Sequence, residues 1–193
     1  IFSFHDWKAE AGFDYIGGAG DPLFFNYGMG IAEGKLFENA PSFKAGIFNI
    51  GTRHKKSRHG WSIRTDQNIV DVILGKDLPT WMGGGRFFVA GFSGSRAMGK
   101  NKQGFMVAYT QSFCPDTYCD GTEYNKWVFC ADYASGKNAI GGGGFGVYYY
   151  FNPYISILNG PVWFNSDKIN GHWKWTVQVD ISFKIFECHK LDE

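Results

Sequence analysis

The sequence has no apolar run that approaches the roughly 18 residues needed for a transmembrane helix. It also lacks helical periodicity, since no segment longer than about ten residues repeats apolar side chains at the spacing of an amphipathic helix. Neither sign of charge is in excess, and the net charge of +1 gives no electrostatic case for a nucleic-acid partner. These absences disfavour a helical membrane protein, an all-α domain and a nucleic-acid-binding protein.

What the sequence has in excess is glycine and aromatic side chains. Glycine accounts for 27 of 193 residues, about twice the usual share of roughly 7%. Aromatic residues make up 19% of the chain, which a disordered protein would not show. Together with only six prolines, this composition is typical of many strands joined by tight turns in one domain.

The clearest pattern runs from Trp173 to Phe183, where apolar and polar side chains alternate without a break. A period of two indicates a β-strand with one apolar and one polar face. The segment also has the length of a tilted strand that crosses a bilayer, for which about 9–11 residues are needed. Aromatic residues at its two ends would then lie near the two membrane interfaces.

The same alternation recurs along the chain, with glycine-, asparagine- and proline-rich turns evenly spaced between the segments. The predicted strands are 8–15, 24–31, 42–48, 69–74, 86–93, 104–113, 126–133, 144–151, 155–164 and 173–183. Even spacing favours hairpins between antiparallel neighbours. The predicted fold is therefore all-β: an antiparallel up-and-down transmembrane β-barrel of about 10–12 strands, with further N-terminal strands left open.

Two features favour a membrane barrel over a soluble sandwich, which would show the same alternation. Trp, Tyr and Phe gather at strand ends, as an interfacial girdle requires, and the opposite face is rich in glycine, which lets a narrow barrel close. The expected lipid-facing girdle is Phe13, Tyr15, Trp127, Tyr133, Tyr149, Trp173, Trp175 and Phe183. The expected lumen-facing polar residues are Lys8, Glu10, Asp14, Lys44, Lys126, Asp132, Lys174 and Asp180. A lumen filled by its own side chains is favoured over a conduit lined by ion pairs.

Three segments also carry a family resemblance. GKLFENAPSFKAGIFNIGT, YNKWVFCADYASGKNAIGGGGFGVYYYFNPYISILNGPVWFN and the closing WTVQVDISF resemble uncharacterised, porin-like outer-membrane β-barrel proteins of Gram-negative bacteria. The resemblance implies a fold and a location rather than an activity. The final strand also looks like the C-terminal signal that is read by the barrel-assembly machinery. Residues 184–193 depart from the pattern, because such barrels usually end at the aromatic residue.

The cysteines offer one candidate disulfide. Cys114 and Cys119 flank four residues of a predicted loop between two strands, and an oxidising compartment favours a bridge across it. Their spacing does not fit a redox or zinc motif. Cys130 and Cys188 are interpreted as plain thiols, with a bridge between them left open.

One dense basic run is a weak candidate for a binding loop. Arg53, Lys55, Lys56 and Arg58 could bind anions, lipid phosphates or a protein partner. A solvated surface loop is the favoured interpretation, because most runs of like charge are just that. No paired carboxylates, metal-spaced histidines or catalytic triad stand out, so we expect no enzymatic activity, no metal and no cofactor.

The sequence thus predicts one β-barrel domain over 1–183, followed by a tail over 184–193. We expect it in the outer membrane of a Gram-negative bacterium, with its signal peptide removed. Its expected role is structural or that of a passive narrow channel. Its expected partners are outer-membrane lipids and, during biogenesis, the barrel-assembly machinery, and a protein partner at the basic loop or tail is left open. The alternatives are a soluble β-sandwich that binds carbohydrate and, less favoured, a lipid-modifying enzyme built into a barrel.

Overall fold

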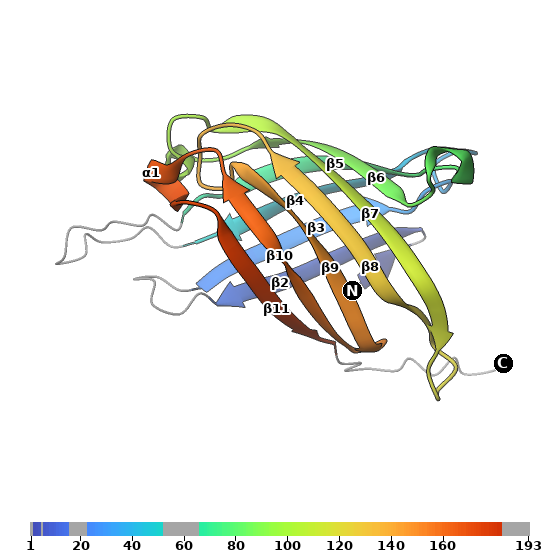
Figure 1. The fold of residues 1–193 in the computed structure, drawn as a ribbon. Coiled ribbons are helices and arrows are strands. Elements are labelled where there is room, and N and C mark those ends of the chain that lie inside the picture. Colours follow the sequence, from blue (N-terminus) through green and yellow to red (C-terminus); the bar gives the residue numbers. More distant parts are fainter. Residues whose placement is uncertain (1, 5, 16–22, 52–65, 183–193) are drawn as a thin grey trace.

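Eleven β-strands form a single antiparallel sheet in which each strand pairs with the next one along the chain (Figure 1). The computed structural model describes residues 2–4, 6–15, 23–51 and 66–182. The strands are β1 (Phe2–Phe4), β2 (Trp7–Tyr15), β3 (Leu23–Ile31), β4 (Ser42–Ile50), β5 (Ile69–Asp77), β6 (Arg86–Ser93), β7 (Gln103–Thr117), β8 (Glu123–Ala134), β9 (Gly142–Asn152), β10 (Ile155–Phe164) and β11 (Lys174–Ile181). Three short helical turns lie in the connections: η1 (Thr80–Met82), η2 (Arg96–Met98) and α1 (Asp167–Asn170).

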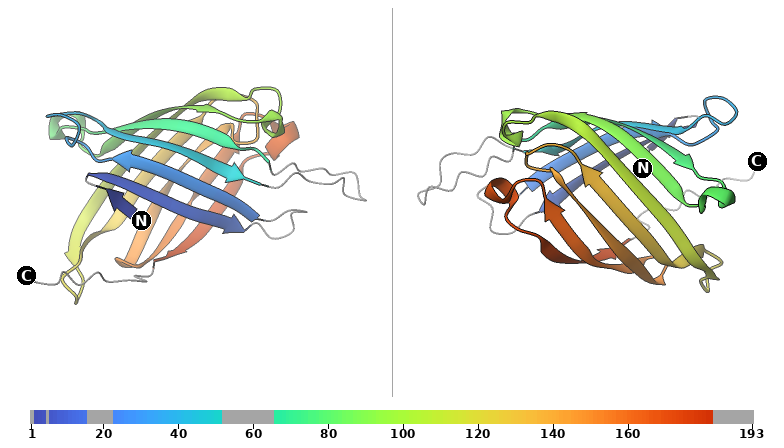
Figure 2. Two further views of the ribbon diagram at one scale, coloured as in Figure 1. Left: turned by 180° about the vertical axis from the view of Figure 1, so that it is seen from behind. Right: turned by 45° about the horizontal axis from the view of Figure 1, so that its top comes forward.

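The all-β, up-and-down architecture predicted from the alternation is confirmed. All ten predicted segments are strands, and β1 is an additional one. The sheet curls around a central space, which both views of Figure 2 show. Among the described residues β1 pairs only with β2, and β11 pairs only with β10, so the sheet is not closed into a barrel.

The connections between strands fall alternately at two ends of the sheet, because neighbouring strands are antiparallel. We use the name rim A for the end of the sheet at which β6 joins β7, β8 joins β9 and β10 joins β11. The other end, where β3 joins β4, β5 joins β6, β7 joins β8 and β9 joins β10, is rim B. Rim B includes the two tightest described turns between long strands, at residues 118–122 and 153–154.

Glycine permits close packing on the concave side of the sheet. At Gly30, an added Cβ would lie 2.5 Å from the carbonyl oxygen of Phe43 on the neighbouring strand. At Gly141, an added Cβ would collide with the carbonyl oxygen of Gly136 in the tight connection between β8 and β9. Side chains at these positions would push the backbone apart, so the glycines support the sharp curvature of the sheet.

The main hydrophobic core lies inside the curve of the sheet near rim A. Ile69, Phe92 and Met98 are buried there, and Phe48, Met106, Ala139 and Ile140 pack against them. Met98 is the last residue of η2, and its side chain is fully buried. The Ser95 hydroxyl caps this turn by accepting a hydrogen bond of 2.9 Å from the Ala97 amide. The β6–β7 connection therefore folds inward and closes part of rim A.

A set of asparagine side chains ties the rim A connections together. Asn138 is fully buried, donates to the Ser135 carbonyl at 3.1 Å and accepts from the Ile140 amide at 3.1 Å. Its own carbonyl accepts from the Asn170 side chain at 3.0 Å, which brings in the β10–β11 connection. Asn165 donates to two further carbonyls of the β8–β9 region. The Asn101 side chain of the β6–β7 connection also accepts a hydrogen bond of 3.1 Å from the Lys137 amide. Three connections are thus held in one arrangement by hydrogen bonds that satisfy backbone groups.

The predicted disulfide between Cys114 and Cys119 is wrong, since both cysteines are free and exposed. The expected loop is shorter than predicted because β7 continues through Thr117. An extended strand rises about 3.3 Å per residue, so Cys114 is carried away from the turn that holds Cys119, beyond the roughly 4–7 Å between Cα atoms that a disulfide allows. Cys130 is also free, whereas Cys188 lies outside the described residues.

Two other predicted features lie outside the described residues. They are the basic run with Arg53, Lys55, Lys56 and Arg58, and the tail over 184–193.

The asparagine network generates a stability prediction. Asn138→Ala leaves the Ile140 amide and the Ser135 carbonyl without their partner in a buried position. We expect a loss of roughly 1–3 kcal/mol in the free energy of unfolding, the usual cost of stranding buried polar groups. Urea unfolding followed by tryptophan fluorescence measures this loss. Lys137→Ala, at the exposed neighbouring side chain, is the control and should change stability little, and equal losses for both variants would contradict the role of the network.

Candidate functional site

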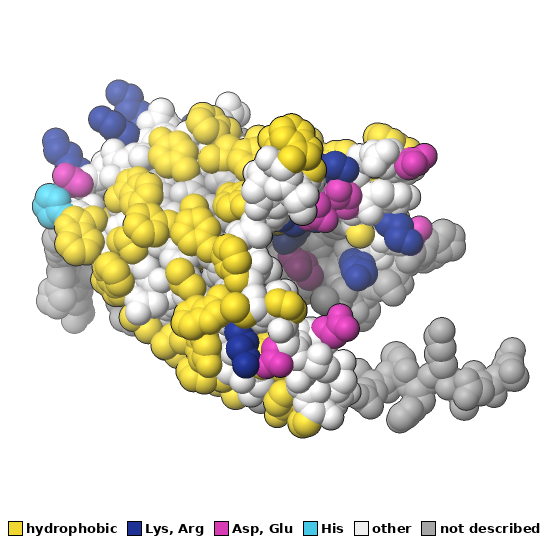
Figure 3. All heavy atoms as spheres, turned by 45° about the vertical axis from the view of Figure 1, so that its right-hand side comes forward, with side chains coloured by type: hydrophobic (Ala, Val, Ile, Leu, Met, Phe, Trp, Pro, Cys, Tyr) yellow, Lys and Arg dark blue, Asp and Glu magenta, His cyan; other side chains and the backbone are white. Residues whose placement is uncertain are grey.

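The two faces of the sheet differ sharply in chemistry. On the convex face, apolar side chains are exposed along successive strands, as β11 illustrates with Trp175 at 61%, Val177 at 60% and Val179 at 60%. Figure 3 shows hydrophobic side chains spread over this outer surface, whereas Lys, Arg, Asp and Glu gather in and around the hollow that opens at rim B and at the opposite end of the molecule. The protein is therefore apolar outside and, in part, charged inside. This arrangement is the reverse of an ordinary water-soluble domain.

The aromatic residues of the convex face form two rows over β7–β11. The row toward rim A consists of Phe105, Tyr133, Phe145, Trp163 and Trp175, and the row toward rim B of Phe113, Trp127, Tyr149 and Phe151. The rings contact one another across strands, with centroid distances of 6.2 Å in the first row, between Phe105 and Tyr133, and 4.6 Å in the second, between Trp127 and Tyr149. Between the rows lie mainly aliphatic side chains such as Val147 and Val177, together with one aromatic pair, Tyr109 and Phe129.

Most residues of the expected girdle can be placed in this pattern. Phe13, Trp127, Trp173 and Trp175 are exposed, and Tyr133 and Tyr149 are half-exposed with aromatic neighbours. Phe183 lies outside the described residues, and Tyr15 is described only as the backbone end of β2.

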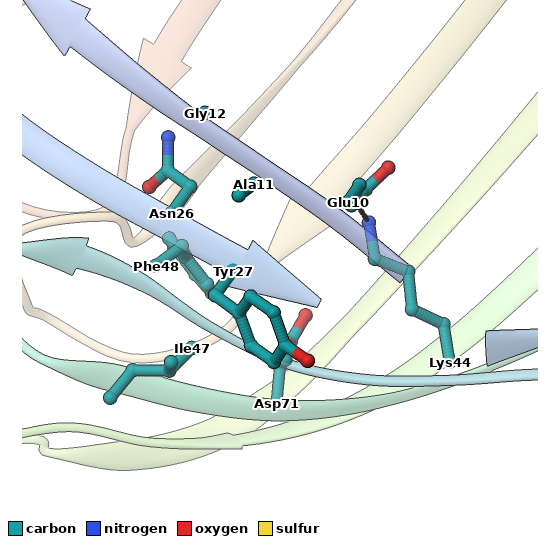
Figure 4. A pocket seen from close by; sticks show the side chains of 10 residues that line it. Glu10, Ala11, Gly12, Asn26, Tyr27, Lys44, Ile47, Phe48 and Asp71 are labelled. Atoms are coloured by element: carbon teal, nitrogen blue, oxygen red, sulfur yellow. Dashed lines mark hydrogen bonds and ion pairs between the residues drawn. The ribbon is translucent and has the colours of Figure 1, made fainter. Parts of the chain in front are cut away.

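A polar cluster occupies the concave face between β2 and β5 (Figure 4). The Lys44 ammonium on β4 forms an ion pair with the Glu10 carboxylate on β2. Asp71 on β5 is buried beside them, and together they line a hollow of about 430 Å³. Nearer rim A, the Asn26 side chain donates a hydrogen bond of 2.7 Å to Asp14. Three strands thus contribute charged groups that line the same hollow.

The eight polar residues expected on the inner face do not form one ladder of ion pairs. Among the described residues, only Glu10 and Lys44 of that set pair with each other. Lys126 pairs instead with Asp116 at 3.0 Å, and Asp132 accepts a hydrogen bond of 3.1 Å from the Gly144 amide. Lys8 lies on β2, and Asp14 pairs with Asn26 as described above. The Lys174 ammonium lies 5.3 Å from the ring centre of Phe164. The Asp180 carboxylate accepts a hydrogen bond from the Gln178 side chain.

The other half of the concave face is apolar, which the sequence analysis missed. Phe48, Phe88, Phe92 and Met106 occupy strand positions that alternate with the exposed apolar ones, so they point to the concave side. The sequence carries a signal for it, because apolar residues occupy both alternating sets of positions along β6. The concave surface is therefore divided into a charged half over β2–β5 and an apolar half over β5–β10.

A second charged cluster lies at rim B. Glu33, in the β3–β4 connection, pairs with Lys76 at 2.7 Å and with Arg86 at 3.2 Å, and Arg86 also pairs with Asp77 at 2.6 Å. The hydrogen bond from Lys76 is the largest of the causes that lower the pKa of the Glu33 carboxyl, and the Asp77 amide and the Arg86 charge act in the same direction. Partial burial opposes them. The cluster fastens the β3–β4 connection to β5 and β6, a long-range contact for which the sequence held no local signal.

The described residues offer little for metal or covalent chemistry. They contain no group of three or more His, Cys, Asp or Glu side chains placed to hold a metal ion. Among them, no helix combines the length and the apolar character needed to cross a membrane. Comparisons of the chain with protein-family models, with curated proteins and with solved structures returned no match. The two faces of the sheet are therefore the observations from which a function can be argued.

The Glu33 cluster predicts a specific pH dependence. Because the pKa of Glu33 is lower in the folded protein than its ordinary value of 4.5, the ion pairs stabilise the fold above that pH, and this contribution is lost as the pH falls through the folded-state pKa. Glu33→Gln should therefore lower stability at pH 7 by about 1 kcal/mol, since solvent screens these partly exposed pairs. The difference from the unaltered protein should shrink below about pH 4.5.

Thermal unfolding at pH 7 and at acid pH measures this effect. Glu38→Gln is the matched control, because Glu38 is exposed in the same connection and should show no such pH-dependent difference. A Glu33→Gln deficit that stays constant across the pH range would contradict the proposed contribution of the carboxylate.

Proposed function

We propose that this chain forms a transmembrane β-barrel in the outer membrane of a Gram-negative bacterium, where its role is mainly structural. The observation that carries the proposal is the exposed apolar surface of the convex face, which continues over successive strands. Apolar surface costs roughly 25 cal/mol for each Å² in contact with water, and monomeric soluble proteins rarely leave large contiguous patches exposed. A lipid environment removes this cost, while the charged groups of the concave face stay away from the acyl chains.

The two aromatic rows support the same proposal. Outer-membrane barrels carry an apolar band of about 25 Å flanked by aromatic girdles at the two interfaces. Over β7–β11 the aromatic rings gather toward rim A and toward rim B, with mainly aliphatic side chains between them. Tyr and Trp favour such boundaries because each has an apolar ring and a polar group. The resemblance of three segments to porin-like outer-membrane proteins agrees with this location.

The topology also favours a barrel over the alternative of a carbohydrate-binding sandwich. A sandwich is made of two sheets that pack face to face and bury their apolar faces against each other. Here all eleven strands belong to one sheet, and its most apolar face is turned outward. A single curled meander is the arrangement from which up-and-down barrels are built.

The directions of β1 and β11 bear on how this sheet could close. Alternate strands of an antiparallel meander run in the same direction, so β1 and β11 are parallel to each other. An antiparallel barrel closes only with an even number of strands, as bacterial single-chain barrels show. We therefore propose that β1 and β11 are not direct antiparallel partners in the closed barrel.

The packing of the interior favours a structural role over that of an open pore. Met98 and its neighbours fill the space inside rim A, and the Glu10–Lys44 ion pair occupies the charged half. Small barrels are commonly filled by their own side chains. Any passive passage is therefore narrow. Outer-membrane lipids remain the proposed surroundings, with the barrel-assembly machinery acting during biogenesis.

Arginine substitutions on adjacent residues of β11 test the membrane proposal. Val177 lies on the convex face, level with Val147 between the two aromatic rows, and Gln178 lies on the concave face. Val177→Arg should impair assembly strongly, because an arginine that faces the middle of the bilayer costs roughly 2–4 kcal/mol, whereas Gln178→Arg should be tolerated. The measurement is the fraction of detergent-extracted protein that migrates faster on a gel unboiled than boiled, since a folded barrel resists the gel detergent until it is heated.

Two results would overturn the proposal. One is equal tolerance of arginine at both positions. The other is unaltered protein that dissolves in plain buffer and shows no change in migration on boiling; glycan binding by a soluble module would then be tested.

Planar-bilayer recordings test the closed interior. We expect the unaltered protein to give no large conductance steps, and Met98→Ala to increase conductance because it removes the side chain that packs on Ile69 and Phe92. Met82→Ala, an exposed methionine in η1 near rim B, is the control and should leave the conductance unchanged. Large, steady steps from the unaltered protein would show instead that the interior is an open pore.

A further inference from the structure

The apolar half of the concave face encloses a cavity of about 450 Å³. Its walls come from β4–β10 and from the β8–β9 connection, and include Phe48, Ile73, Phe88, Met106, Ile140 and Phe164. Cavities that bind small molecules usually measure roughly 300–1,000 Å³ and are lined mainly by apolar and aromatic side chains. This cavity has both properties, and it lies on the side of the sheet opposite to the proposed lipid-facing surface.

One end of the cavity borders the core at rim A. Phe48, Met106 and Ile140 line the cavity and also pack against the buried Ile69, Phe92 and Met98. Water molecules are not stabilised in such a cavity, because its apolar lining offers them few hydrogen-bond partners. An apolar guest, in contrast, would recover the dispersion contacts that the lining atoms lack. The shape and chemistry therefore suit a hydrocarbon chain whose end rests against Met106 and Ile140.

The other end of the cavity carries more polar side chains. A second hollow, of about 400 Å³, shares Ala108, Asp132 and Val162 with the first. Its lining is mixed: Leu158 is apolar, whereas Thr110, Thr176 and Gln178 are polar. The two hollows together therefore offer an apolar compartment and a mixed one that can bind a polar head, joined at Asp132.

Asp132 determines which polar head would suit this junction. Its side chain is accessible, accepts one hydrogen bond from the Gly144 amide and has no ion-pair partner among the described residues. An ionised carboxylate has several acceptor sites, so it can take further hydrogen bonds from a ligand. It would attract a protonated amine, accept from a hydroxyl and repel a carboxylate.

We propose that this cavity binds a single-chain amphiphile, with the hydrocarbon chain in the apolar compartment and a hydrogen-bond-donating, non-anionic head at Asp132. The proposal goes beyond the structural role argued above. It does not depend on what surrounds the convex face, because every group that it uses lies on the concave side. Binding inside the sheet must be distinguished from simple adsorption of the amphiphile to the exposed apolar surface.

Photolabelling makes that distinction. The probe is dodecylamine with a photoreactive diazirine near the end of its chain, added to the folded full chain, and the labelled residues are identified by mass spectrometry. We expect labels on Met106, Ile140 or Phe164 inside the sheet, and we expect unlabelled dodecylamine to compete them away. Labels confined to convex residues such as Val72 and Val89 would overturn the proposal, as would labelling no stronger than that of heat-unfolded protein.

A cavity-filling variant tests the apolar compartment. Ala108→Trp places an indole in the space shared by the two hollows and should reduce inner-face labelling by about tenfold, which corresponds to about 1.4 kcal/mol of binding free energy. Val89→Trp adds the same side chain to the convex face of β6 and should leave the labelling unchanged. Equal effects of the two substitutions would contradict binding in the cavity, and circular dichroism confirms that both variants fold.

A charge variant tests the head group. Asp132→Asn should weaken competition by dodecylamine and remove its advantage over laurate, while competition by dodecanol stays similar. Asp14→Asn removes a carboxylate from the charged half of the concave face and is the matched control. An unaltered protein that prefers laurate to dodecylamine, or an Asp132→Asn variant with the original preference, would refute the assignment of Asp132.

Discussion

The alternation of side chains across a pleated sheet is the constraint on which the rest of this structure depends. Once eleven strands are hydrogen-bonded in sequence order, each side chain is assigned to the convex or the concave face by its position alone. A slip of one residue would exchange Val177 and Val179 for Thr176 and Gln178 on the outer surface of β11. The apolar exterior and the mixed interior are thus two consequences of a single register.

Curvature adds a second level to this constraint. The sheet curls, as Figure 2 shows, and this brings concave residues of distant strands into contact. The pleat and the pairing of neighbouring strands would not produce these contacts by themselves. The charged and apolar halves of the interior are separated by this geometry. Glu10 and Lys44 come from strands with one strand between them, and they neutralise each other in a hollow. Met98 reaches the opposite half only because its connection folds inward at rim A.

The sequence was sufficient to predict the strands and the two faces, because alternation is a local property. It was insufficient for the interior, because a pattern of period two does not reveal which concave residues meet after the sheet has curled. Phe88 and Phe92 therefore escaped notice as parts of an apolar compartment. The prediction of a disulfide between Cys114 and Cys119 was wrong for a different reason. The local sequence suggested a loop that begins at Cys114, but pairing with β8 extends β7 as far as Thr117.

The interior of the sheet differs between its two ends. At rim A, the described connections are tied by Asn138 and closed by Met98, whereas the hollow with its charged side chains opens at rim B. A space that described side chains partly fill at one end is less suited to conduct solutes than to retain a ligand, since a guest gains contacts with those side chains on entry. The same packing that argues against a wide pore therefore argues for a binding chamber. Asp132, at the junction of the apolar and mixed hollows, is the group through which such a chamber could discriminate among ligands.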